Sequence, residues 1–405
     1  MHIAFIAPFG MQPKATTSAR MLPLAQALAR RGHHVRIVIP PWDDPSAPTN
    51  LQTRHIPSPA GDGGVEILTL PLPRHAPNSL SLTFGLIRSA LHPPVHKLIQ
   101  NPDVVHVFKP IGYSGLAAFV LQALRIPWVL DMDDWEGPGG WTDINPYSPA
   151  QKVLITLTEA MLPRMAGAVT VASRTLQARA WDLGLPRRRV FYMPNGVWGE
   201  KYGEWNVGAR SVATHAVPLQ SGPTILLYTR FAEFPYRWPL YVLRHVLQAH
   251  PTAKLLVVGE GFFGEEEKLK ADAARLGLQD NIIVTGRVAE EDVPAYLAMG
   301  DVALYPIEDN LITRAKSPVK VLEPMLMGLP IVAHRVGQAA EFIGDAGVLV
   351  EPGNLHDMAH AVSTLLSDPA RRKHLGERAQ KRVWTKFNWE RLCLQAEEAY
   401  RLALL

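Results

Sequence analysis

Short apolar runs rich in β-branched residues alternate along the chain with longer stretches whose apolar positions recur every three or four residues. The first pattern is typical of buried strands and the second of amphipathic helices, so the alternation predicts an α/β fold built from repeated β-α units around parallel sheets. The first half contains predicted strands at 2–8, 34–40, 65–71, 103–109, 127–133, 168–173 and 189–194. The second half contains predicted strands at 224–230, 253–261, 281–288, 301–307, 330–336 and 347–352.

A polar stretch at 199–222 has little periodicity and separates the two series, which predicts a linker. A chain of 405 residues is also too long for one ordinary core. We therefore expect two doubly wound, Rossmann-like domains, 1–200 and 201–385, that face each other across a cleft. The last helix, about 386–405, precedes no strand, and we expect it to pack back against the first domain.

Composition narrows the class of protein. Hydrophobic residues make up 47% and charged residues 19%, as in a globular protein. A net charge of +4 and a pI near 9.1 suit phosphate-bearing ligands or an anionic membrane surface but fall short of a nucleic-acid-binding signature. The only cysteine, Cys393, excludes an intramolecular disulfide, and no stretch of about 20 apolar residues predicts a membrane span, so we expect a cytoplasmic protein.

The segment RAKSPVKVLEPMLMGLPIVAHRVG, residues 314–337, combines cations with a predicted helix start. Ser317 and Pro318 fit an N-cap and a first helical position, so the N–H groups of Val319 and Lys320 would point out of a helix N-terminus. Such an end attracts anions, and Lys316 and Lys320 add positive charge. The pattern predicts a phosphate or diphosphate site.

Glu323 follows five residues after Pro318, roughly 7.5 Å along a helix axis at about 1.5 Å per residue. A carboxylate at that distance can accept hydrogen bonds from the ribose of a nucleoside diphosphate. The alternative is an ordinary surface pair of Lys320 and Glu323, since the two lie three residues apart. Pro324 predicts a kinked or short helix in either case.

The order and spacing of several motifs resemble the retaining glycosyltransferases of family 4. In the second half these motifs are YTRF, LLVVGEG, IIVTGRV, YLAMGDVALYPI, SPVKVLEPMLMGLPIVA and GVLVEPGN. In the first half they are LAQALARRGHHV, DVVHVF and MPNGV. The resemblance covers nearly the whole chain and implies the GT-B architecture of two Rossmann-like domains. It also implies transfer of a sugar from a UDP- or GDP-sugar donor to a glycan or lipid-linked acceptor, without a metal or other cofactor.

By this resemblance, a basic pair, Arg230 and Arg237, neutralises the donor diphosphate as negative charge grows on it. Gly10, after the first strand, lies where backbone N–H groups approach the donor phosphate, and Lys14 adds charge. Further donor contacts are expected at Gly259 and at Gly286, Arg287 and Val288, the last three beside the base.

Two positions depart from the family pattern. Glu323 matches the second glutamate of the Glu-x7-Glu motif, but Ala315 stands where the first is expected, so Lys316, Ser317 or Glu308 would have to contact the donor sugar instead. Asp133 stands where relatives have histidine. We assign Asp133 a catalytic or sugar-binding role as a hydrogen-bond acceptor.

Asp131, Asp133 and Asp134 follow one another closely at a predicted strand end, which also suits a metal site or acid-base chemistry; a solvated loop cluster is the alternative. Trp135 and Trp141 could stack on a sugar or serve only in packing.

Residues 79–100 combine leucine, phenylalanine and isoleucine with Arg88, His92, His96 and Lys97. A basic amphipathic helix of this kind could lie on an anionic leaflet, which predicts a peripheral membrane contact. A core helix with solvated charges is the alternative. Two other functions also stay open: a catalytically silent nucleotide-binding scaffold, which Ala315 and Asp133 would favour, and a sugar-nucleotide epimerase.

Overall fold

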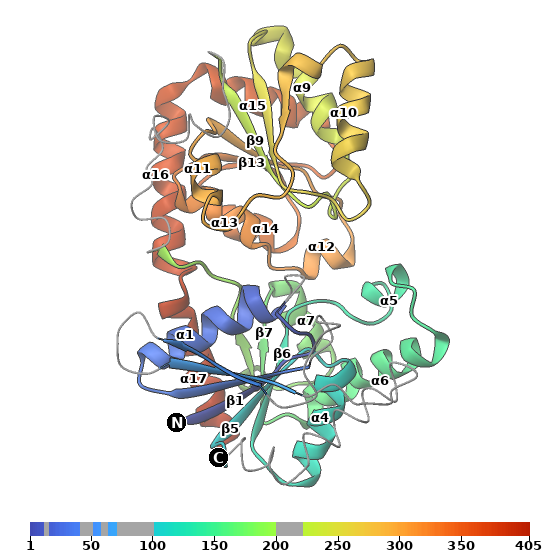
Figure 1. Ribbon diagram of the computed structural model, residues 1–405, viewed down its shortest axis with the longest axis vertical. Coiled ribbons are helices and arrows are strands. Elements are labelled where there is room, and N and C mark those ends of the chain that lie inside the picture. Colours follow the sequence, from blue (N-terminus) through green and yellow to red (C-terminus); the bar gives the residue numbers. More distant parts are fainter. Residues whose placement is uncertain (12–15, 41–51, 58–63, 71–100, 200–221) are drawn as a thin grey trace. The chain divides into compact units, whose positions relative to one another are not determined.

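The computed structural model describes residues 1–11, 16–40, 52–57, 64–70, 101–199 and 222–405 (Figure 1). The chain forms two compact units. Unit 1 comprises Met1–Gly196, Ala315–Ser317 and Trp389–Leu405, and unit 2 comprises Val197–Arg314 and Pro318–Asn388. Residues 79–100, in which a membrane-binding helix is predicted, lie outside the described residues.

Unit 1 is built on an eight-stranded sheet in the order β3-β4-β2-β1-β5-β6-β7-β8. Neighbouring strands are parallel except for the antiparallel pair of β3 and β4. The strands are β1 (His2–Ile6), β2 (His34–Ile39), β3 (Gln52–Pro57), β4 (Gly64–Thr69), β5 (Val104–Phe108), β6 (Trp128–Met132), β7 (Ala168–Val171) and β8 (Val190–Tyr192). The strands predicted in the first half are confirmed. β3 is not predicted, because its side chains are almost all exposed and show no apolar alternation.

The helices of unit 1 are η1 (Thr17–Met21), α1 (Leu22–Arg30), α4 (Gly112–Ala123), α5 (Trp141–Ile144), α6 (Pro149–Met165), α7 (Arg174–Asp182), η2 (Arg187–Arg189) and α17 (Trp389–Ala403). η1 is a π-helical turn that runs directly into α1. Gly32 follows the end of α1 with φ +82°, as a C-cap glycine requires. The terminal helix α17 packs on α1 and β7, and its Glu397 forms an ion pair with Arg31 at 2.5 Å.

Unit 2 is built on a six-stranded parallel sheet in the order β11-β10-β9-β12-β13-β14. Its strands are β9 (Thr224–Tyr228), β10 (Lys254–Val258), β11 (Ile282–Val284), β12 (Val302–Tyr305), β13 (Ile331–His334) and β14 (Val348–Val350). Its helices are α9 (Trp238–Ala249), α10 (Glu265–Arg275), η4 (Gln279–Asn281), α11 (Val293–Leu297), α12 (Leu311–Ala315), α13 (Val319–Leu326), α14 (Gly337–Ile343), α15 (Leu355–Ser367) and α16 (Pro369–Lys386). All six strands predicted in the second half are confirmed.

Helices cover both faces of the unit 2 sheet (Figure 1), and the sheet has a buried core on each face. Successive residues of a strand point to opposite faces, so Leu226 packs in one core and Ile225 and Leu227 in the other. This explains why the strands are continuous apolar runs. It also leaves the carboxyl ends of the strands as the place where polar side chains gather.

Candidate functional site

The carboxyl ends of β9, β10 and β11 meet through backbone contacts. The N–H of Gly259 donates to the carbonyl oxygen of Gly286 at 3.0 Å. Gly259 has φ +128°, and a Cβ there would overlap the carbonyl oxygen of Thr229, so only glycine fits. The structure thus brings together two glycines that the sequence assigns to donor binding. After Gly286, Arg287 is exposed and Val288 packs half-buried on the core.

A tyrosine, a lysine and a glutamate form a compact group at the end of β9. Glu323, in the middle of α13, is only 7% exposed. The hydroxyl of Tyr228, the last residue of β9, forms a side-chain hydrogen bond with Glu323. Lys320 places Nζ 3.4 Å from the centre of the Tyr228 ring, a favourable cation–π contact. We call these residues the Tyr228 group; because Glu323 is buried, the alternative of an exposed Lys320–Glu323 pair is wrong.

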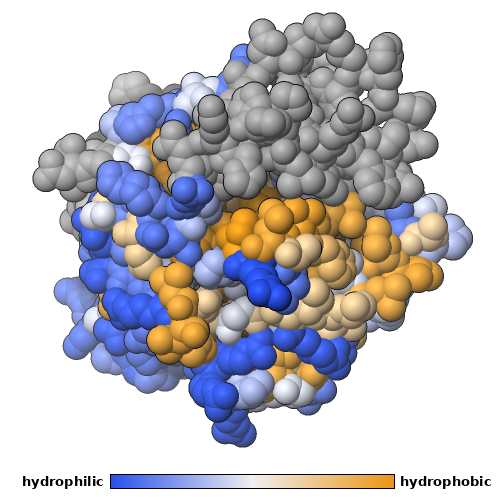
Figure 2. Space-filling view, turned by 90° about the horizontal axis from the view of Figure 1, so that it is seen from below, coloured by the Kyte–Doolittle hydropathy of each residue, from blue (hydrophilic) through white to orange (hydrophobic). Residues whose placement is uncertain are grey.

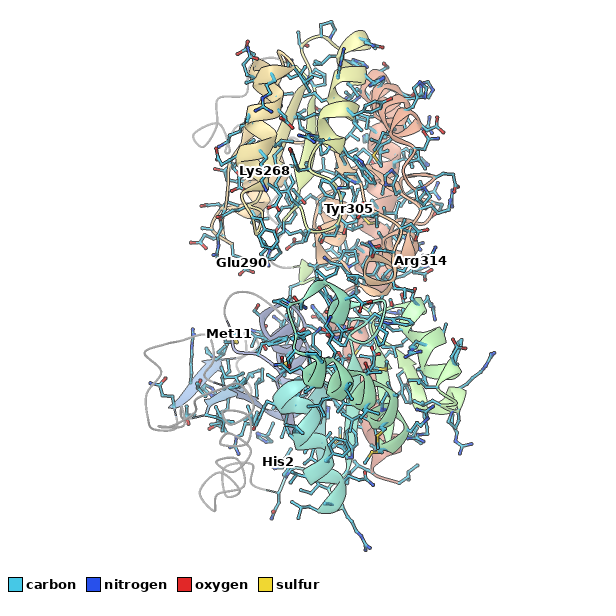
Figure 3. The ribbon with its side chains drawn as sticks, turned by 90° about the vertical axis from the view of Figure 1, so that its right-hand side faces the viewer. His2, Met11, Lys268, Glu290, Tyr305 and Arg314 are labelled. Carbon is cyan, nitrogen blue, oxygen red and sulfur yellow. The ribbon has the colours of Figure 1, made fainter. Side chains whose placement is uncertain are left out.

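The electrostatics of this group keep the tyrosine protonated. Burial raises the pKa of Tyr228, and the charge of Glu323, its hydrogen bond and the charge of Glu290 raise that pKa further. The positive charge of Arg230 lowers the same pKa, so the Arg230 guanidinium also acts on this group. In Figure 3, Glu290 lies at the edge of unit 2, whereas Tyr305 at the end of β12 lies inside. At neutral pH the Tyr228 hydroxyl therefore donates to Glu323.

The two arginines predicted to neutralise a diphosphate have different surroundings. Arg230 is half-buried, and its guanidinium lies 5.8 Å from the centre of the Phe262 ring. Arg237 precedes α9, and its Nε lies 2.6 Å from Oδ2 of Asp272 in α10. The hydrogen bond from Arg237 lowers the pKa of Asp272, so Arg237 is already neutralised by a carboxylate. Arg230 is the stronger candidate of the two.

The start of α13 differs from the prediction. The helix begins at Val319, and Pro318 occupies the N-cap position with extended backbone angles, so Ser317 is not the cap. Instead the Ser317 hydroxyl accepts a hydrogen bond from the N–H of Asn195 at 2.9 Å, and its carbonyl accepts one from the Asn195 side chain at 2.7 Å. Ser317 is therefore tied into unit 1, and Lys316 beside it is half-buried.

Ala315 is fully buried and packs in the apolar core of unit 1. A carboxylate at this position would be buried among apolar side chains at a high free-energy cost. Glu308 is exposed, and its N–H donates to the carbonyl oxygen of Glu233 at 2.9 Å. The contact to a donor sugar that the family motif implies at this point stays a prediction for Lys316, Ser317 and Glu308.

In unit 1 a buried lysine gathers three carboxylates at the ends of β5 and β6. Nζ of Lys109 lies 3.1 Å from Asp133, 2.5 Å from Asp134 and 2.6 Å from Glu136. The other oxygen of Asp133 accepts a hydrogen bond from the Thr16 hydroxyl at 2.6 Å. Asp133 is therefore buried and already paired, and its predicted catalytic role toward a sugar stays a prediction.

The same three carboxylates, Asp133, Asp134 and Glu136, have the oxygen donors that a hard divalent cation prefers. The ammonium of Lys109 lies among them and balances part of their charge. Burial opposes the charge on Lys109, but the carboxylates outweigh burial and raise its pKa well above the ordinary value. Burial raises the pKa of Glu136 to about 7, although Lys109 acts against the shift. Lys109 has φ +62°, a strained conformation for a residue with a side chain.

A second buried ion pair lies beside this group. The guanidinium of Arg20, in η1, donates to both oxygens of Asp131 at 2.8 and 2.6 Å. Thr170 also donates to Asp131 and contacts His106, whose other ring nitrogen contacts Tyr400 of α17 at 2.8 Å. His106 is thus a buried strand residue in a polar network. Asp131 thus has an ion-pair partner of its own in Arg20, whose charge also interacts with Asp133 and Asp134.

Sequence reasoning missed three residues of these groups: Arg20, Lys109 and Tyr228. The available signal was the position of Lys109 and Tyr228 at the carboxyl ends of predicted strands.

Gly10 is buried after β1, next to Met11, which Figure 3 shows in unit 1. Lys14 lies outside the described residues. Trp135 packs under the Arg179 guanidinium and donates to the Pro138 carbonyl oxygen at 2.9 Å, which indicates a packing role.

Two sheets, one parallel and one parallel except for its edge strand β3, with polar side chains at their strand ends define a protein of two Rossmann-like units. Two family models match successive parts of the chain: one described as "Glycosyl transferase 4-like domain" at residues 16–196, and one as "Glycosyl transferases group 1" at residues 222–368. The chain belongs to the group 1 glycosyltransferases and has the GT-B fold.

Three known proteins illustrate the relationship. The 2-deoxystreptamine glucosyltransferase of Streptomyces kanamyceticus is 28% identical over 54% of this chain and 56% of its own. The GDP-mannose-dependent alpha-(1-6)-phosphatidylinositol monomannoside mannosyltransferase of Mycolicibacterium smegmatis is 27% identical over 56% of this chain and 59% of its own. The alignments thus span little more than half the length of these curated relatives. The Anabaena HepE structure with UDP-glucose superposes with a TM-score of 0.70 at 18% identity, covering 98% of both chains, and shows the fold.

Proposed function

We propose that this chain is an enzyme that transfers a sugar from a UDP- or GDP-sugar to a glycan or lipid-linked acceptor, with retention at the anomeric carbon. The observation that carries the proposal is the Tyr228 group with Arg230 beside it. It combines two cations with a buried carboxylate at the strand ends of a Rossmann-like unit. Two of the proteins named above support the proposal: the mannosyltransferase is GDP-mannose-dependent, and the HepE structure contains UDP-glucose.

In this reaction the bond between the anomeric carbon and the diphosphate breaks, and the acceptor oxygen bonds to the same face of that carbon. The departing diphosphate takes the acceptor proton. Arg230, Lys320 and the N-terminus of α13 stabilise the negative charge that grows on the diphosphate, so the scheme requires no metal. Glu323 accepts hydrogen bonds from the ribose hydroxyls.

A catalytically silent scaffold is the second candidate, because Ala315 is buried in an apolar core and Asp133 is already paired. Turnover separates the two. UDP-glucose and GDP-mannose are incubated with a panel of glycan and lipid-linked acceptors, and NMR follows donor consumption and the anomeric configuration of the product. The proposal predicts a product of retained configuration from wild type and its loss in Glu323→Ala. Binding of a donor without consumption would favour the scaffold, and a new sugar nucleotide without acceptor would reveal an epimerase.

Access to a lipid-linked acceptor calls for contact with a bilayer surface. None of the helices that the structure describes combines the length and apolar character needed to cross a membrane. We propose a peripheral contact with that surface.

A further inference from the structure

Helix α6 presents an apolar surface to solvent. Val153, Leu157 and Met161 are 59%, 52% and 46% exposed. They are spaced four residues apart and so lie along one side of the helix. We call these three residues the α6 apolar stripe. Figure 2 shows that hydrophobic side chains also gather in a continuous area on one face of unit 1.

Helix α6 differs from an ordinary surface helix because it exposes apolar side chains and buries its acidic one. Its only acidic residue, Glu159, is buried and accepts a hydrogen bond from the N–H of Glu136 at 2.9 Å. The other buried residues of the helix are Ile155, Thr158, Leu162 and Pro163. A helix that faces only water carries charged residues on its outer side. The outward apolar stripe therefore indicates a surface that meets something less polar than water.

The carboxyl end of α6 is strongly basic. Arg164 continues the line of the stripe three residues after Met161 and is exposed. Arg189 donates to the Arg164 carbonyl oxygen at 3.2 Å, so η2, with exposed Arg187 and Arg188, lies beside this end of the helix. In the part of the chain that the structure describes, no carboxylate forms an ion pair with Arg164, Arg187 or Arg188.

We propose that the α6 apolar stripe and these three arginines form a docking surface for a bilayer containing anionic lipids. The stripe enters the boundary between headgroups and acyl chains, while the arginines meet lipid phosphates. Charge favours this occupant: lipid phosphates carry the opposite charge to the three arginines, whereas a second copy docked through the same surface would set these arginines against their own counterparts. The inference deepens the peripheral contact proposed above by assigning it to a surface, and its test requires neither a donor nor turnover, so it can fail while the proposed reaction stands.

Co-sedimentation of the full chain with vesicles tests the proposal. Wild type is expected to bind vesicles of phosphatidylcholine with phosphatidylglycerol more tightly than vesicles of phosphatidylcholine alone, and less tightly at high salt. Leu157→Glu should weaken binding about tenfold or more, because it removes an inserted side chain and adds repulsion. Arg188→Glu should weaken binding by at least roughly fivefold, and only on anionic vesicles. Leu276→Glu, at an exposed leucine of unit 2, is the matched control.

A fluorescent probe locates the contact directly. An environment-sensitive dye is attached to Leu157→Cys; the native Cys393 is buried, and burial raises its pKa to about 12, so it stays unreactive. A blue shift is expected with anionic vesicles and not for the same dye at Leu276→Cys. The proposal fails if wild type ignores anionic vesicles, if Leu157→Glu binds them unchanged, or if light scattering shows a dimer that Leu157→Glu converts to a monomer.

Discussion

Replacing Tyr228 by phenylalanine removes one hydroxyl and keeps the ring under Lys320. The hydroxyl holds Glu323, which is almost fully buried, so its loss leaves the carboxylate less well positioned. A hydrogen bond to a charged group contributes about 1.5–3 kcal/mol, and we expect part of that to be lost from ribose recognition. Wild type should prefer UDP or GDP over its 2′-deoxy form by roughly tenfold, since one hydrogen bond to Glu323 is missing. In Tyr228→Phe the preference should fall to about threefold.

Calorimetric titration of each variant with the ribose and 2′-deoxyribose nucleotides measures this ratio. Tyr241→Phe, at an exposed tyrosine of the same unit, is the control and should leave the ratio unchanged. If Tyr228 had only a structural role, Tyr228→Phe would weaken the binding of the ribose and the 2′-deoxyribose nucleotides equally. If Tyr228→Phe keeps the full preference for ribose, then Tyr228 does not position Glu323 for that contact.

Three further predictions follow from the same geometry. Gly259→Ala should lower the free energy of unfolding by at least about 3 kcal/mol, measured by urea denaturation, whereas Gly286→Ala, which has open space around its Cβ, should cost only about 1–2 kcal/mol. Arg230→Ala should weaken nucleotide binding about tenfold or more in calorimetry, whereas the neutralised Arg237 should tolerate alanine within about threefold; the reverse order would restore Arg237 as the diphosphate ligand. Glu136 has a raised folded-state pKa of about 7 against an ordinary 4.5, so its contribution to stability is fully present below about pH 4.5 and is lost as the pH rises through 7. Relative to Glu136→Gln, wild type should therefore lose up to about 3 kcal/mol across that window in unfolding titrations, and parallel curves would contradict the shift.

The strands other than β3 were predictable because each is a buried apolar run between turn residues. Their alternation with helical segments predicted two parallel sheets. β3 was not predictable, because an exposed edge strand such as Gln52–Pro57 carries no such pattern. The position of Glu323 on a helix that starts near Pro318 was predictable from the sequence of its own segment. Its tyrosine partner was not, because Tyr228 and Glu323 are 95 residues apart (323 − 228) and meet only when β9 packs beside α13.

The cluster of Lys109 with Asp133, Asp134 and Glu136 shows the same limit. Three acidic residues in a short segment suggest a metal or an acid-base site equally well. Only the fold shows that a lysine from the preceding strand end lies among them. Likewise, only the fold shows the partner of Ser317. The Ser317 hydroxyl accepts a hydrogen bond from the N–H of Asn195 and does not cap α13.

The most direct test of the account is calorimetric binding of UDP, GDP, ADP and NAD to wild type and to Glu323→Ala, with EDTA present throughout. The account predicts binding of one nucleoside diphosphate, UDP or GDP, in EDTA, and its loss or strong weakening in Glu323→Ala. Absence of binding to all four, or binding that the substitution leaves untouched, would contradict the assignment of the Tyr228 group as the donor site.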